Sequence, residues 1–248
     1  MLLRNELLKF RRSHVWTVLV LIPLISVAYG AGNYSANREM LTAGWSSYLS
    51  QVVLFYGLFF MTIGTAILAA AAWRLEHRGF NWNQLMTVPR GIGGIIAAKI
   101  GAIVVLVAIM QLIVLALSLG VGLALRIPGT IPWANLAGIV LAVIPAAAVA
   151  AWQSFFSMII RNFAAPVAIA LAGTILTFGA ISAGFEQLMW ILPSALVTNT
   201  LSTGSTAVST AGNLDAATLI SLLIASALLT ALGWATSVAW LRRVDIRS

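Results

Sequence analysis

Long apolar stretches without Asp, Glu, Lys or Arg alternate with short polar segments along most of the chain. A helix needs roughly 20 apolar residues to cross a bilayer, and six of the stretches read as continuous helices of that length. The pattern predicts an all-α integral membrane protein that forms a single domain over residues 1–248. We expect six transmembrane helices at about residues 15–34, 50–73, 97–124, 135–160, 165–185 and 217–241.

A seventh apolar stretch lies between the predicted fifth and sixth spans, and it is broken. Pro193 and Asn199 interrupt it, and a Ser/Thr/Gly-rich tract that is too polar to span a membrane follows at 202–212. We predict an extracellular loop over 186–216 whose apolar part is either re-entrant or lies on the outer surface. Trp190, Pro193 and Leu196 in this part form a candidate outer gate, and a lid that merely closes the bundle is the alternative.

Composition and charge support this picture. Hydrophobic residues make up 61% of the chain and charged residues 8%, against roughly 25% charged residues in ordinary soluble domains. The net charge is +8, but the basic residues lie between apolar stretches, and no basic face suited to nucleic acid is present. Twelve of the 14 Lys and Arg residues fall on one side of the predicted topology, which places both termini in the cytoplasm.

The first 14 residues are expected to form an amphipathic helix. Helical periodicity puts Leu3, Leu7 and Phe10 on one stripe, with most of the arginines elsewhere. Such a segment is typical of an interfacial helix that lies on membrane lipid at the inner leaflet. The alternative is a basic tail that serves only as an orientation signal.

The predicted cytoplasmic connection over 74–94 carries a second short helix. Gly79 can end the preceding span and Asn81 can cap a new helix, which would present Trp82, Leu85 and Met86 within one turn. An exposed apolar ridge of this kind indicates a docking site for a cytoplasmic partner. The alternative is an anchor in the lipid headgroups.

The residues offer little for catalysis. The chain has no cysteine and only two histidines, His14 and His77, and no acidic residue lies deep in a predicted span. The glycines at 91–94 lack the Lys-Ser/Thr ending of a phosphate-binding loop. We therefore expect no catalytic, cofactor or metal site in this chain. Five polar residues inside the spans serve either helix packing or a substrate path, with packing the more common role: Thr62, Thr65, Gln111, Gln153 and Ser154.

The whole arrangement resembles the permease subunits of type-2 ABC exporters, in particular the small permeases of lantibiotic-immunity and bacitracin-resistance type. The resemblance covers essentially the whole chain. Besides the six spans and the broken outer segment, it rests on Glu6, Lys9, Glu76, Trp82, Leu85, Pro89 and Lys99.

The resemblance implies a bacterial cell-membrane protein that moves an amphipathic substrate, such as an antimicrobial peptide or a drug, out of the membrane or cell. It further implies a cytoplasmic ABC ATPase that holds the ATP and Mg²⁺, and a second permease copy or paralogue. The residues that would contact the ATPase are Glu76, Arg78, Phe80, Asn81, Trp82, Leu85 and Met86.

A different class of function stays open from the residues alone. A six-span scaffold or sensor accessory could use the same cytoplasmic loop to hold a partner without moving a substrate. A neighbouring reading frame that encodes a Walker-type ATPase would favour the exporter, and an isolated gene would favour the scaffold.

Overall fold

The computed structural model describes residues 2–11, 13–77, 91–185, 187–207 and 215–243, and every regular element within them is a helix. The prediction of an all-α fold is therefore confirmed. The helices are α1 (Leu2–Lys9), α2 (Val15–Ala36), α3 (Trp45–Phe55), the π-helical turn η1 (Tyr56–Phe60), α4 (Met61–His77), α6 (Ile92–Ala124), α7 (Trp133–Leu141), α8 (Val143–Ile159), α9 (Ala164–Ser182), α10 (Leu188–Ile191), α11 (Pro193–Leu201) and α12 (Ala216–Arg243).

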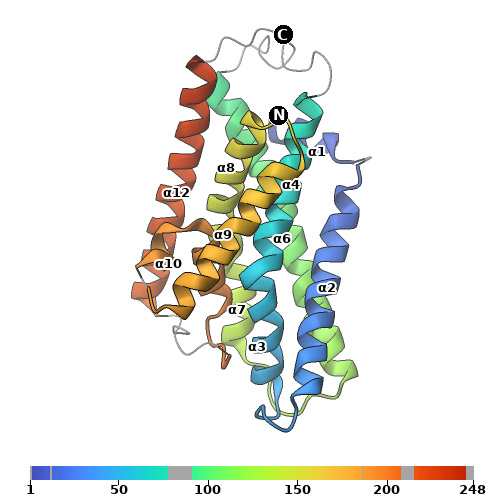
Figure 1. Cartoon of the computed structure of the whole chain (residues 1–248). Coiled ribbons are helices and arrows are strands. Elements are labelled where there is room, and N and C mark those ends of the chain that lie inside the picture. The colour runs from blue at the N-terminus through green and yellow to red at the C-terminus, as the bar shows by residue number, and fades with distance from the viewer. Residues whose placement is uncertain (1, 12, 78–90, 186, 208–214, 244–248) are drawn as a thin grey trace.

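Six continuous helical segments are long and apolar enough to cross a membrane, as predicted. Some of them consist of two or three consecutive helical elements. They are α2, α3 with η1 and α4, α6, α7 with α8, α9, and α12. Figure 1 shows these helices side by side, with α1 and the C-terminal end of α12 at the same end of the bundle.

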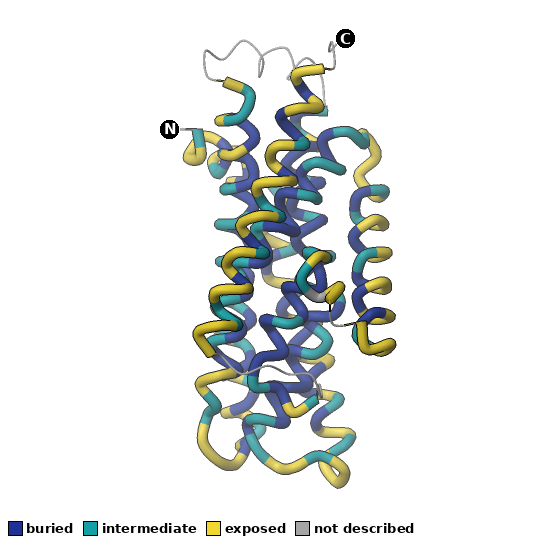
Figure 2. The backbone as a smooth tube through the Cα atoms, turned by 90° about the vertical axis from the view of Figure 1, so that its left-hand side faces the viewer, coloured by how far each residue is buried: buried dark blue, intermediate teal, exposed yellow. Residues whose placement is uncertain are grey.

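Burial separates central spans from peripheral ones. The most apolar windows of the second span (α3–η1–α4) and the fourth span (α7–α8) are 67% and 61% buried, whereas that of α12 is 17% buried. In Figure 2 the exposed residues follow the outward faces of the helices. Close backbone approach helps to form this core: a Cβ atom on Gly30 of α2 would lie 2.5 Å from the Cα atom of Val52 in α3.

The third span begins earlier than predicted, at Ile92 instead of residue 97. The predicted connection over 74–94 includes Gly93 and Gly94, whereas both lie in the first turn of α6. Gly93 packs closely against α12. The Trp234 indole of α12 donates a hydrogen bond from Nε1 to the Gly93 carbonyl oxygen at 2.9 Å, and a Cβ atom on Gly93 would lie 2.9 Å from that ring. Packing thus outweighs local propensity here.

Two of the spans are interrupted. The second contains the wider turn η1, and such turns often occur at functional sites. The fourth divides into α7 and α8 around Ala142. Pro145 explains this break, because proline has no N–H group to donate to the Leu141 carbonyl one turn earlier.

The broken segment between α9 and α12 enters the bundle. Along α11, Ser194 to Thr198 are all buried. Near the start of α11, the Ser194 hydroxyl donates to the carbonyl oxygen of Gly173, the middle residue of α9, at 3.3 Å. Beyond α11, the Thr206 amide donates to Ser50 Oγ in the middle of α3 at 2.8 Å. The segment therefore reaches about the middle of α9 and then returns (Figure 1).

Candidate functional site

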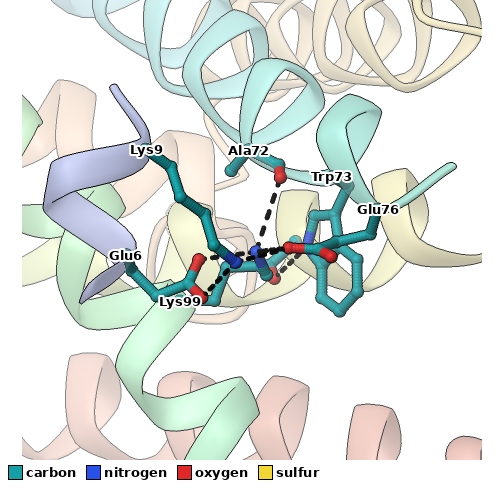
Figure 3. A network of polar contacts seen from close by, with 7 residues as sticks. Glu6, Lys9, Ala72, Trp73, Glu76 and Lys99 are labelled. Atoms are coloured by element: carbon teal, nitrogen blue, oxygen red, sulfur yellow. Dashed lines mark hydrogen bonds and ion pairs between the residues drawn. The ribbon is translucent and has the colours of Figure 1, made fainter. Parts of the chain in front are cut away.

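Four charged side chains form a buried network where α1, α4 and α6 meet (Figure 3). Lys99 Nζ donates to Glu6 Oε2 at 2.7 Å and to Glu76 Oε1 at 3.0 Å. Lys9 Nζ donates to Glu6 Oε1 at 2.6 Å and to the same Glu76 oxygen at 2.7 Å. We call Glu6, Lys9, Glu76 and Lys99 the charge network.

Lys99 is the most deeply placed member of the charge network. Its side chain is 0% exposed, and its ammonium group has three N–H donors. Two point at the glutamates, and the third has the Ala72 carbonyl oxygen at 3.4 Å. The ammonium group also lies 5.0 Å from the centre of the Trp73 ring, a favourable position for a cation. Burying a charged group is costly unless it is paired and hydrogen-bonded, and both conditions are met here.

The network is electrically balanced, with two carboxylates and two ammonium groups. Lys9 lies outside the spans and is its most exposed member, with 33% of its side chain accessible. Burial by itself would lower the pKa of Lys9, but hydrogen bonds and charges from Glu6 and Glu76 outweigh this and raise it above its ordinary value of 10.5. The Lys9 ammonium group is therefore charged at neutral pH.

The charge network ties together three segments that are far apart in sequence. Glu6 and Lys9 come from α1, Glu76 lies in the last turn of α4, and Lys99 lies two turns inside α6. Residues 78–90 connect α4 to α6 in the sequence. The Glu76–Lys99 ion pair joins these same two helices. Helical spacing puts Lys9 within reach of Glu6 in the sequence, but the pattern does not predict that this pair meets Glu76 and Lys99.

Of the seven residues expected to contact an ATPase, only Glu76 is described by the structure. It is buried, at 3% exposed, and belongs to the charge network. The predicted coupling helix lies outside the described residues, and with it the other six: Arg78, Phe80, Asn81, Trp82, Leu85 and Met86.

The predicted interfacial helix corresponds to α1, which packs on α6 through Leu3 beside Gly101. The three residues of its predicted apolar stripe differ in exposure. Leu3 is 40% exposed, Leu7 is half-buried, and Phe10 is buried in the core. The side of α1 that carries Glu6 thus faces the bundle, and contact of α1 with lipid stays a prediction.

The five polar residues in the spans divide into two groups. Thr65 Oγ1 donates to the Met61 carbonyl oxygen one turn earlier in α4, and Ser154 Oγ accepts a hydrogen bond from Trp73 Nε1 at 2.7 Å, which joins α8 to α4. Gln111 donates to the Met61 sulfur at 3.2 Å. Thr62 and Gln153, in contrast, line a common cavity between α4, α8 and α9.

The three candidate gate residues differ in burial and surroundings. Pro193 lines the cavity that Thr62 and Gln153 share. Leu196 is completely buried in the core contacts of α11, and Trp190 is half-buried on α10. Among the described residues, no group of three or more His, Cys, Asp or Glu side chains could hold a metal ion.

Fold and polar network together define a multi-pass helical membrane protein with an N-terminal helix ion-paired to its second and third spans. The sequence model of the ABC-2 family transporter protein matches residues 2–177, from α1 into α9. The chain belongs to this family and is an ABC permease of the ABC-2 type, a class that generally pairs with an ABC ATPase. A comparison with curated proteins finds no match.

Proposed function

We propose that this chain is the permease of an ATP-driven exporter that moves an amphipathic substrate, such as an antimicrobial peptide or a drug, out of the membrane or cell. A separate cytoplasmic ABC ATPase would supply ATP and Mg²⁺, and a second permease copy or paralogue would complete the pathway. The bacterial cell membrane is the proposed location. Lantibiotic immunity is the proposed subgroup.

The observation that best supports this function is the Glu76–Lys99 ion pair at 3.0 Å. It joins the two helices that flank residues 78–90, the segment where the sequence predicts ATPase docking. A force applied to that segment would act on α4 and α6 as one unit, because pulling the buried pair apart would leave uncompensated charges. The connection to α1 through Glu6 extends the unit to the N-terminal helix.

The surface of the bundle suits a pathway completed by a second permease. Large exposed hydrophobic side chains follow α2, α9 and α12. Lipid and the second permease would share the task of covering these faces. The substrate would then pass near the permease contact or along a lateral opening of one subunit.

Transport is tested in cells that express the chain together with its partner ATPase. We expect greater resistance to membrane-active peptides than in cells whose ATPase lacks its catalytic Walker glutamate. ATP-dependent export of a fluorescent cationic peptide from proteoliposomes would establish the activity. A stable complex with the ATPase, but no ATP-dependent movement of any tested amphipathic compound, would favour the scaffold alternative.

Docking is tested separately with Trp82→Ala combined with Leu85→Ala. The pair should release the ATPase from purified complexes while the permease stays inserted in the membrane. Leu123→Ala, an exposed position at the other end of α6, is the control and should not affect binding. Full retention of the ATPase by the double variant would contradict docking at this ridge.

A further inference from the structure

A cavity of about 510 Å³ lies between α2, α4 and the start of α9, at the end of the bundle that carries α1 (Figure 1). Its walls are mainly apolar and come from three segments: Val15 and Val18 in α2, Ile67 and Ala71 in α4, and Phe163 directly before α9. Val18, Ile67 and Ala71 are half-buried, and Phe163 is 37% exposed. A ligand can therefore reach this apolar surface from outside the bundle.

Arg74, in the last turn of α4, is a charged residue that lines the same cavity. The residue is exposed, and its guanidinium carbon lies 5.5 Å from the centre of the Phe163 ring. Among the described residues no carboxylate forms an ion pair with Arg74, and the two buried glutamates are paired with lysines. A guanidinium group has five N–H donors and no acceptor, and the exposed His14 imidazole in the cavity adds a further N–H. These groups suit an anion.

The charged and apolar parts of the cavity follow one another along α4. Ile67, Ala71 and Arg74 are four and three residues apart, so they form one stripe on the helix. At 1.5 Å per residue this stripe is about 10 Å long, with Arg74 at the end of the span and Ile67 inside it. At the start of α2, Trp16 is 47% exposed and donates from Nε1 to the Phe10 carbonyl oxygen at 3.1 Å. Exposed indole rings at the ends of spans favour the headgroup layer, so the cavity runs from that layer into the hydrocarbon.

The charge of this end of the bundle indicates which ligand fits. Twelve of the 14 Lys and Arg residues lie on the predicted cytoplasmic side, and the cytoplasmic leaflet carries the anionic lipids that basic pockets between spans bind. A soluble anion would make no use of the apolar walls. A phospholipid offers a phosphate to the guanidinium group and hydrocarbon to the walls.

We propose that this cavity binds one anionic phospholipid of the cytoplasmic leaflet. Its phosphate lies against Arg74 and His14, and one acyl chain follows Ala71 and Ile67 along α4. The bound lipid then covers the furrow between α2 and α9. This site needs no transported substrate and goes beyond the proposed exporter function.

The proposal is tested by the binding of radiolabelled dioleoylphosphatidylglycerol to the full chain in detergent micelles. We expect saturable binding of one lipid per chain at the site of highest affinity. Dioleoylphosphatidylcholine, which has the same acyl chains but no net charge, should compete about 5-fold less well than unlabelled dioleoylphosphatidylglycerol. Glycerol phosphate, which has the phosphate but no acyl chains, should not compete at the same concentration.

Arg74→Gln removes the charge at the cavity and should weaken phosphatidylglycerol binding by about 5- to 30-fold, the effect of one charged contact with an anionic headgroup. Arg74→Lys keeps the charge and should lose less affinity. Arg242→Gln is the matched control, because Arg242 is also exposed and lies in the last turn of α12 at this end of the bundle, but does not line the cavity. Its affinity should match that of the parent.

Ala71→Leu tests the apolar wall, because the larger side chain would occupy the place assigned to the acyl chain. We expect binding to weaken by about 4-fold or more, the value of one buried methylene group. Ala227→Leu is the control, since Ala227 is exposed on α12 and lines a different groove. Size-exclusion profiles that match the parent show that all variants fold. Unchanged affinity in Ala71→Leu would overturn the proposal.

Four other outcomes would also overturn it. Equal losses in Arg74→Gln and Arg242→Gln would show general attraction to a basic surface, and equal competition by dioleoylphosphatidylcholine would show an apolar groove without recognition of charge. Competition by glycerol phosphate would show a site for soluble phosphate, and no saturable binding would show that no lipid is held. The assay needs neither ATP nor an ATPase, so its failure would leave the exporter proposal standing.

Discussion

At the scale of single residues, Lys99 is a fully buried lysine that depends on ion-pair partners from two other helices. Its ammonium group is ion-paired with Glu6 and Glu76, and one Glu76 oxygen accepts from both lysines. Removing one partner of a buried ion pair leaves an uncompensated charge, whereas removing a matched pair does not. The members of the charge network are therefore expected to behave as a unit when they are replaced.

Lys99→Met should lower the free energy of unfolding by about 3–5 kcal/mol. Glu6 and Glu76 would then share only the partly exposed Lys9. The double variant Lys99→Met with Glu76→Gln should be more stable than Lys99→Met alone, because it restores the balance of charge. Denaturant unfolding in detergent micelles measures both. Simple additivity of the two substitutions would argue against a coupled network.

Lys9 gives the network a dependence on alkaline pH. Because the pKa of Lys9 is raised in the folded chain, the folded state holds this proton more tightly than the unfolded state. The stabilisation is fully present below the ordinary lysine pKa of 10.5 and is lost as the pH rises through the higher folded pKa. The stability difference between the parent and Lys9→Met should thus be constant near neutral pH and shrink above about pH 10.5. If the stability difference already shrinks as the pH rises from 7 to about 9, this assignment is contradicted.

At the scale of helices, the sequence predicted all six spans because each is a long apolar stretch, and the limits agree within about five residues. It could not predict the features that depend on distant partners. Gly93 packs against Trp234 of α12, and α11 packs on η1, where Thr198 donates to the Gly57 carbonyl oxygen at 2.9 Å. For the same reason the pattern identified Thr62 and Gln153 as polar but could not show that they share a cavity.

The packed position of α11 depends on a small residue in α7. A Cβ atom on Gly138 would lie 2.8 Å from the Thr200 carbonyl oxygen, so Gly138→Leu should displace α11. A cysteine in place of the buried Leu196 should react slowly with maleimide in the parent background and much faster in Gly138→Leu. Gly120→Leu is the control, since nothing lies within 4 Å of its added Cβ atom. Equal reaction rates in all backgrounds would contradict the seating of α11 against α7.

At the scale of the whole molecule, the charge bias predicts which end of the bundle faces the cytoplasm. The chain has no cysteine, so single introduced cysteines report on each end. Ser205, in the predicted outer loop after α11, is a poor position for a labelled cysteine because it is only 8% exposed. Met40 after α2 is 88% exposed and is a better position. In intact cells an impermeant maleimide should label Met40→Cys but not His14→Cys at the start of α2. The reverse labelling pattern would contradict the predicted orientation of the bundle.

The charge network also has a consequence for how the protein is made. Glu76 and Lys99 are 23 residues apart and leave the ribosome one after the other, with Glu6 already synthesised. Each would be costly in lipid by itself, so the second and third spans are expected to enter the bilayer together as a helical hairpin whose charges neutralise each other. Until Lys99 has been synthesised, Glu76 would have to stay near the aqueous surface.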